Sequence, residues 1–257
     1  IESEPDPRDR GLRSAEAVQQ IVRLNLFHIL QATARAEGAG VPAKGLTGLG
    51  YEGHYFWDTE MYVAPFLIYT APRVAKNLLK FRFSMLEAAR QRAREVNQKG
   101  ALFPWRTISG EEASAYYAAG TAQYHINADI VYALRKYAEA TGDEDFLMRE
   151  GAEVLVETAR LWLDLGFFAE SHDGRFSIVV VTGPEEYNTV VNDNAFTYLL
   201  ARENLWFATR IVERLRRERP DAYEALKHRT GLEDAEPRSW REVADAMYLP
   251  YYEDEGI

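Results

Sequence analysis

Apolar side chains recur every three or four residues along most of this chain, which predicts a mainly helical protein. The first such stripe (Val18, Ile21, Val22, Asn25 and Ile29) predicts a helix from Ser14 to about Glu37, and Gly38 stands where a glycine often ends a helix. Further helices are predicted over residues 58–69, 72–97, 125–141, 143–166, 193–219, 220–228 and 239–247.

One segment has the pattern of a β-hairpin instead. Phe167-Phe168-Ala169 and Arg175-Phe176-Ser177-Ile178 flank His172-Asp173-Gly174, which is typical of a hairpin turn. We therefore expect a short hairpin near 167–182 that leads directly into a Gly-Pro turn. Asn192 or Asp193 is the predicted cap of the long helix that follows.

Helices joined alternately by short and long loops make up the predicted pattern. Three long loops, at 46–60, 101–121 and 181–194, are rich in aromatic and acidic residues. Long loops in a compact helical protein usually carry function. Since no fixed-period repeat is visible, the pattern does not favour a helical solenoid.

Composition and charge argue against several classes of protein. The 257 residues carry a net charge of -10, which argues against nucleic acid or an anionic membrane as the main partner. No apolar run approaches the roughly 20 residues that span a bilayer, and the acidic start is unlike a signal peptide. The absence of cysteine suits the cytoplasm. Both ends of the sequence read as cut, so we expect a fragment of a longer protein.

The segment most typical of an active site is Gly183-Pro184-Glu185-Glu186-Tyr187, which places two carboxylates on a rigid turn. A carboxyl group that works as a general acid needs a fixed backbone and a partly dry setting. Spacing alone does not separate Glu185 from Glu186, and an ordinary polar loop is the alternative.

The other two long loops contain aromatic side chains next to carboxylates. Trp57 and Asp58 are adjacent at a predicted helix start, where Asp58 serves either as a helix cap or as a partner for sugar hydroxyls. Trp105 serves either as a core anchor or as a surface on which a sugar ring stacks. His125 has no second ligand at metal-binding spacing, so no metal site is predicted.

These segments together resemble, in order and along nearly the whole chain, the catalytic domain of glycoside hydrolase family 65. The motifs that carry the resemblance are Gly45-Leu46-Thr47-Gly48, Gly53-His54, Phe56-Trp57-Asp58-Thr59-Glu60, Phe103-Pro104-Trp105, His125-Ile126-Asn127-Ala128-Asp129, Thr141-Gly142-Asp143, Gly183-Pro184-Glu185-Glu186-Tyr187 and Asn192-Asp193-Asn194.

The resemblance implies an all-α fold, the (α/α)6 barrel, with its active site in loops at one end. Residues 1–257 would form the N-terminal part of that catalytic barrel. The end of the barrel and the flanking β domains would be absent, so the chain alone is expected to be inactive.

It also implies an inverting phosphorylase of α-linked glucose disaccharides such as maltose, kojibiose or trehalose, with Glu186 as general acid. Glu185 stands where the family usually has Asp, and it is expected to bind the substrate together with Trp57, Asp58, Trp105 and His125. Inorganic phosphate would be the nucleophile and co-substrate, with no cofactor, and the full-length protein would be a homodimer. A hydrolase of the same family and an inactive sugar-binding scaffold are the alternatives, and the disaccharide linkage is not encoded in these motifs.

Overall fold

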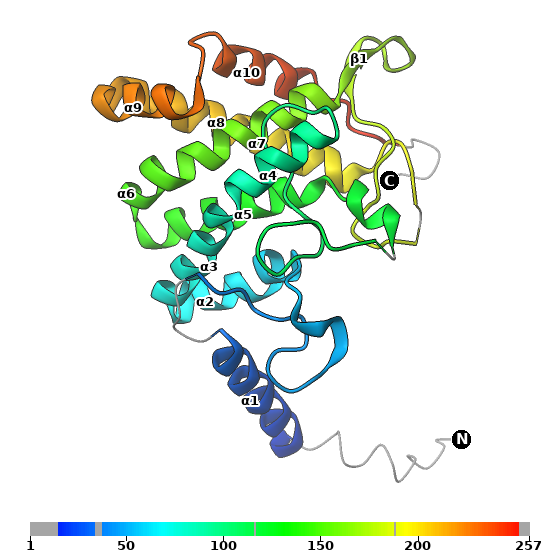
Figure 1. Ribbon diagram of the computed structural model, residues 1–257, viewed down its shortest axis with the longest axis vertical. Helices are drawn as coiled ribbons and strands as arrows, with labels where there is room; N and C mark the ends of the chain where they lie inside the picture. Colours follow the sequence, from blue (N-terminus) through cyan, green and yellow to red (C-terminus); the bar gives the residue numbers. More distant parts are fainter. Residues whose placement is uncertain (1–14, 34–37, 116, 188, 252–257) are drawn as a thin grey trace.

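The computed structural model describes residues 15–33, 38–115, 117–187 and 189–251. This part of the chain is mainly helical and contains a two-stranded antiparallel sheet, as the sequence predicts (Figure 1). The long helices are α1 (Ala15–Ala32), α2 (Ala64–Thr70), α3 (Pro72–Ser84), α4 (Leu86–Glu95), α5 (His125–Thr141), α7 (Ala152–Leu165), α8 (Ala195–Glu218), α9 (Pro220–Thr230) and α10 (Glu236–Ala246). The short elements are the 3-10 turns η2 (Gly50–Gly53), η4 (Ala118–Ala122) and η6 (Glu170–His172), the π-turns η3 (Thr59–Val63) and η5 (Leu147–Gly151), the single helical turn α6 (Glu144–Phe146), and the strands β1 (Phe167–Ala169) and β2 (Arg175–Ser177).

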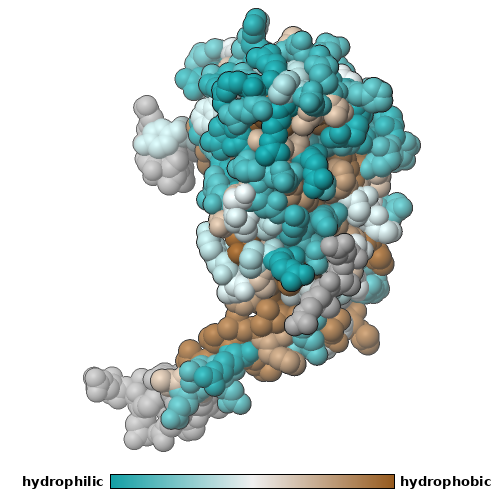
Figure 2. Space-filling view, turned by 90° about the vertical axis from the view of Figure 1, so that its left-hand side faces the viewer, coloured by the Kyte–Doolittle hydropathy of each residue, from teal (hydrophilic) through white to brown (hydrophobic). Residues whose placement is uncertain are grey.

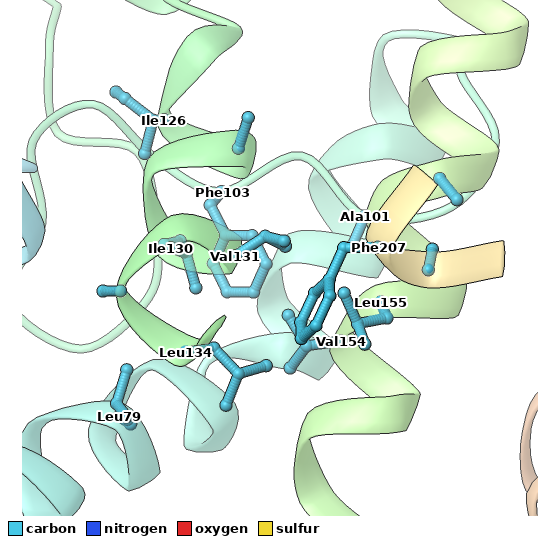
Figure 3. Packing of buried hydrophobic residues seen from close by; sticks show 14 of the residues in the cluster. Leu79, Ala101, Phe103, Ile126, Ile130, Val131, Leu134, Val154, Leu155 and Phe207 are labelled. Atoms are coloured by element: carbon cyan, nitrogen blue, oxygen red, sulfur yellow. The ribbon is translucent and has the colours of Figure 1, made fainter. Parts of the chain in front are cut away.

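The core lies around α5, α7 and α8. Helix α8 packs against α5, α7 and α10, while α5 also packs against α2 and α3. Figure 3 shows side chains from several of these helices meeting in the core, among them Leu134, Val154 and Phe207. The periodicity of the sequence predicts one buried face for each of the helices 125–141 and 143–166, and every residue of the two faces is buried, so those predictions are confirmed. The residues are Ile126, Ile130, Ala133, Leu134 and Tyr137 in the first helix and Leu147, Val154, Leu155, Thr158 and Trp162 in the second.

Helix ends follow local chemistry. Gly142 takes a left-handed conformation with φ 68° after α5, at the predicted end of that helix, and the Asp143 carboxylate accepts the amide hydrogen of Phe146 at the start of α6, where the next helix is predicted to begin. The predicted cap of α8 was wrong by one or two positions. Asn194 fills that role by accepting from the amide of Thr197.

Two predicted elements are shorter than expected. The helix predicted over 72–97 divides at Met85 into α3 and α4, and the Ser84 hydroxyl donates to the Phe81 carbonyl at the break, a bond that often bends helices. The hairpin ends at Ser177 instead of continuing to residue 182. The next amide, that of Ile178, donates to the Tyr198 hydroxyl at 2.9 Å and so cannot extend the sheet.

Helix α1 projects from the rest of the molecule (Figure 1). Its predicted stripe does not enter the core: Val18, Ile21 and Val22 are exposed, and only Ala32 at its end is buried. Ser14 and Glu37, the predicted ends of this helix, lie outside the described residues. Figure 2 shows apolar side chains gathered at the end of the molecule from which α1 projects. In the described ranges, each helix is too short or too polar to cross a bilayer.

Candidate active site

The three long loops singled out in the sequence meet at one cavity of about 650 Å³. Trp57 and Asp58 come from the first loop, Trp105 from the second, and Pro184 and Glu186 from the third. The end of α1 forms another wall. The size falls in the range of small-molecule sites, roughly 300–1,000 Å³.

Backbone hydrogen bonds hold the three loops together. Tyr55 and Thr107 exchange a pair of bonds, at 2.7 and 3.2 Å, that joins the first loop to the second. Thr182 joins the third loop to η4, because its amide donates to the Ala122 carbonyl and its hydroxyl donates to that of Ala119. These bonds hold the three loops in place relative to one another without a ligand.

Glu186 sits in a strained turn. Its φ of 61° lies in the left-handed region, which costs a non-glycine residue of order 1 kcal/mol or more. Its amide donates to the carbonyl of Gly183 across the turn. A Cβ on Gly183 would lie 2.5 Å from the side-chain amide nitrogen of Asn194, so the turn also uses the small size of glycine.

Two donors converge on one oxygen of Glu186. The indole N–H of Trp105 donates to Oε1 at 3.2 Å, and the side-chain amide of Gln123 donates to the same atom at 2.6 Å. A carboxylic acid has one oxygen that accepts strongly and one that carries the proton. In a protonated Glu186 this pair of donors would give the accepting role to Oε1 and leave the proton on Oε2.

Trp105 is held on several sides. Its ring packs against Phe56 and Tyr117, with centroids 5.3 Å away in each case. A Cβ on Gly120 would come within 2.5 Å of the indole. Glu112 fixes the backbone, because its carboxylate accepts the amide hydrogen of Trp105 at 2.8 Å. Trp105 is thus buried, as a core anchor would be, and it also forms a wall of the cavity, while sugar stacking on it stays a prediction.

Trp57 and Asp58 lie where η3 begins. The Trp57 ring packs against His125, with centroids 4.9 Å apart, and against Phe196. The Asp58 side chain makes no helix-capping hydrogen bond and opens onto the cavity. Burial disfavours the charged carboxylate of Asp58 and raises its pKa, and the negative charges of Glu60 and Glu186 raise that pKa further.

Two of the candidate residues do not line this cavity. His125 is fully buried behind Trp57 and contacts Asp129 and Gln123. Glu185 places its carboxylate over Gly183 instead. In the described ranges, no three His, Cys, Asp or Glu side chains converge as metal ligands would.

Sequence reasoning missed Gln123, Glu112 and Gly120 as parts of this site. Gln123 lies two positions before His125, next to a motif already singled out, and this position is what could have marked it as a site residue. Glu112 and Gly120 act by supporting Trp105, a relationship that depends on the folded loop and has no sequence pattern of its own.

Comparison with known proteins gives a consistent picture. The profile of the glycosyl hydrolase family 65 central catalytic domain matches residues 23–257. An α,α-trehalose phosphorylase from Thermoanaerobacter brockii is 51% identical over 242 residues, which are 94% of this chain and 31% of that protein. An α,α-trehalose phosphorylase from Geobacillus stearothermophilus is 52% identical over 244 residues, 95% of this chain and 32% of that protein. A kojibiose phosphorylase from Caldanaerobacter subterraneus subsp. tengcongensis is 36% identical, with 97% of this chain and 34% of that protein covered.

A solved structure agrees with these sequence relatives. A putative kojibiose phosphorylase from the human microbiome superposes with a TM-score of 0.82 at 30% identity, covering 92% of this chain and 34% of its own. The helices therefore form part of an (α/α) toroid, as the sequence predicts. The chain spans about a third of the length of the curated relatives named above.

Proposed function

Because this chain belongs to glycosyl hydrolase family 65 through its central catalytic domain, we propose that the full-length protein cleaves an α-linked glucose disaccharide with inorganic phosphate. The products would be β-glucose 1-phosphate and a free sugar. The observation that carries this proposal is the position of Glu186, which lines a cavity beside Trp57 and Asp58 while two donors engage its Oε1.

Glu186 is the general acid in this mechanism. Its Oε2 gives a proton to the glycosidic oxygen as the bond from that oxygen to the anomeric carbon breaks. The hydrogen bonds from Trp105 and Gln123 become stronger as negative charge develops on the carboxylate, so they stabilise the transition state more than the ground state.

Phosphate supplies the nucleophile. An inverting glycosidase needs a second carboxylate to activate water on the opposite face of the sugar. In phosphorolysis an anionic phosphate oxygen attacks the anomeric carbon directly. The acid is therefore the one catalytic carboxyl group that the protein has to provide. Attack from the face opposite the leaving group inverts the α-linkage and gives the β-phosphate.

The glucosyl ring that is transferred would bind between Trp57 and Asp58. The indole offers an apolar face to the sugar ring, and the carboxylate accepts hydrogen bonds from hydroxyl groups. Both side chains line the cavity together with Glu186. Replacement of Asp58 by Asn is expected to weaken disaccharide binding because one charged acceptor is lost.

We assign α,α-trehalose as the preferred disaccharide. Identity to the two trehalose phosphorylases is 51% and 52%, against 36% to a kojibiose phosphorylase over a similar share of the chain. Release of glucose 1-phosphate from trehalose and from kojibiose, each with and without phosphate, tests this assignment. Phosphate-independent release of glucose would favour hydrolysis instead.

The role of Glu186 is tested by Glu186→Gln in the full-length protein, with Glu185→Gln as the matched variant. A general acid contributes about 100- to 10,000-fold, so Glu186→Gln should lose phosphorolysis by about 1,000-fold. Glu185→Gln should lose less than about tenfold, because this side chain does not line the cavity. A larger loss for Glu185→Gln would exchange the two roles.

A further inference from the structure

A buried row of polar side chains extends from Glu186 into the core. Gln123 donates to Oε1 of Glu186 at 2.6 Å, and its own side-chain oxygen lies 3.2 Å from Nε2 of His125. On the other side of the imidazole, Nδ1 of His125 lies 2.7 Å from Oδ2 of Asp129. The exposed fractions of Gln123, His125 and Asp129 are 2%, 0% and 0%.

The groups next to Nε2 of His125 indicate whether this nitrogen carries a hydrogen. In the structure this nitrogen faces the carbonyl oxygen of the Gln123 side chain, which only accepts, so Nε2 donates when the amide has this direction. Two placements of the hydrogens achieve this: an imidazolium beside a carboxylate, or a neutral imidazole that accepts from a protonated Asp129. In both, the His125–Asp129 pair holds one shared proton and Nε2 donates to Gln123.

A donating Nε2 and the observed direction of the Gln123 amide require each other. With its oxygen bound to His125, its NH2 group must point to Glu186. An amide turned the other way would bring its oxygen against Oε1 of Glu186 and its NH2 against the N–H of the imidazole. The contact with the imidazole would then be repulsive, and the contact with Oε1 would be repulsive too unless Oε1 carried the proton; such a mismatch between buried polar groups costs about 1–3 kcal/mol.

The direction of the amide decides which oxygen of Glu186 carries the proton. Oε1 also accepts from the Trp105 indole, so a correctly oriented Gln123 gives it two donors. With Gln123 reversed, Oε1 could instead hold the proton and donate to the amide oxygen. That proton would point into the core, away from the sugar.

We propose that the buried His125–Asp129 pair is a positioning device for the general acid: by orienting the amide of Gln123, it keeps the transferable proton of Glu186 on Oε2. This inference rests on the proposed function, because it takes Glu186 as the acid. Gln123, His125 and Asp129 are positioning residues here, and none of them lines the cavity.

A purely structural role for this row makes a different prediction. His125 also packs against the rings of Trp57 and Phe196, so the row could serve only to support the sugar-binding wall. Loss of that support would lower the turnover of every glucosyl donor. Loss of proton delivery would affect only donors whose leaving group needs a proton.

The experiment compares trehalose with α-glucosyl fluoride as glucosyl donors in the full-length protein, with phosphate as acceptor. In the fluoride reaction phosphate attacks the anomeric carbon and fluoride departs with the electron pair of the carbon–fluorine bond, so no proton from Glu186 is needed. For Gln123→Met, we expect kcat on trehalose to fall by about 100-fold, with KM and fluoride turnover changed by less than about fivefold.

Asp129→Asn tests the buried pair without changing its shape. The asparagine side chain permits both directions of the Gln123 amide, so the same preference for fluoride should appear with a smaller trehalose loss of about tenfold. Gln98→Met, the same substitution at a remote helix end, is the control and should change neither reaction.

Each outcome distinguishes the two proposals. Equal losses with both donors in Gln123→Met, or unchanged trehalose turnover in Asp129→Asn, would overturn the positioning role. Glu186→Gln provides the reference and should show the strongest preference for fluoride. If Glu186→Gln lacks that preference, the proposed function itself fails.

Discussion

The indole nitrogen of Trp105 lies 3.2 Å from Oε1 of Glu186, although the two residues are separated by 81 positions in the sequence. This hydrogen bond joins the second long loop to the third. It also means that the aromatic wall of the cavity and the carboxyl group of Glu186 are parts of one hydrogen-bonded unit. Changes to the support of Trp105 should therefore alter catalysis as well as sugar binding.

Trp105→Phe removes the donor and keeps an aromatic ring. A hydrogen bond to a charged group contributes about 1.5–3 kcal/mol, so kcat for phosphorolysis should fall by about 10- to 100-fold. Trp206→Phe is the control, because Trp206 also donates to a carboxylate, that of Asp245, at a site remote from the cavity. Initial rates for the full-length variants measure the difference, and equal rates for both would contradict a role for the indole N–H.

Glu112→Ala should loosen the loop that carries Trp105. The Glu112 carboxylate accepts the amide hydrogens of Trp105 and Arg106, and both bonds disappear in the variant. We expect kcat/KM to fall by about tenfold, because a displaced wall misorients the sugar. Glu111→Ala removes the adjacent carboxylate, which is exposed and accepts from the hydroxyl of the nearby Ser109, and should keep wild-type kinetics.

Gly120→Ala should be destabilising. The added methyl group would lie 2.5 Å from the Trp105 ring, and overpacking of this kind costs about 1–3 kcal/mol. A lower melting temperature together with reduced phosphorolysis is the expected result. In Gly50→Ala the new methyl group meets only the flexible side chain of Lys44, at 3.3 Å, so little change is expected.

The buried carboxyl of Asp129 should make stability depend on pH. Burial raises its pKa from 3.8 to about 6, the hydrogen bond and charge of His125 oppose that rise, Glu60 adds to it and Arg82 opposes it. A raised pKa means that the protonated form stabilises the fold. This contribution is complete below pH 3.8 and is lost as the pH rises through about 6.

Asp129→Asn removes that dependence. As the pH rises from about 4 to 7, the free energy of unfolding of the variant minus that of wild type should increase by on the order of 3 kcal/mol. Denaturant unfolding of both proteins across this range measures the change. A constant difference between them would show that Asp129 does not titrate in this interval.

Much of the fold could be predicted because its signals are local. The stripe of α5, the left-handed Gly142 after it and the cap at Asp143 all depend on residues within a few positions of one another. The break at Met85 and the early end of the hairpin were missed. The hairpin ends because Tyr198, from a distant helix, takes the amide hydrogen of Ile178.

The site, too, has parts that could be predicted from the sequence and parts that could not. Trp57, Asp58, Trp105 and Glu186 were identified from their motifs, and the structure brings all four to one cavity. Their chemical roles remain predictions. The direction of His125, away from the cavity and towards Asp129, could not be predicted, because it depends on how α5 packs behind Trp57.

The left-handed backbone of Glu186 has a consequence for how such a protein evolves. Glycine would adopt this conformation without strain, so at this position the residue that folds most easily cannot transfer a proton. With the proposed role of Glu186 as the general acid, selection for stability and selection for turnover would oppose each other at this position. A descendant released from catalysis should acquire glycine or asparagine here early, and that substitution would mark the loss of activity in a sequence comparison.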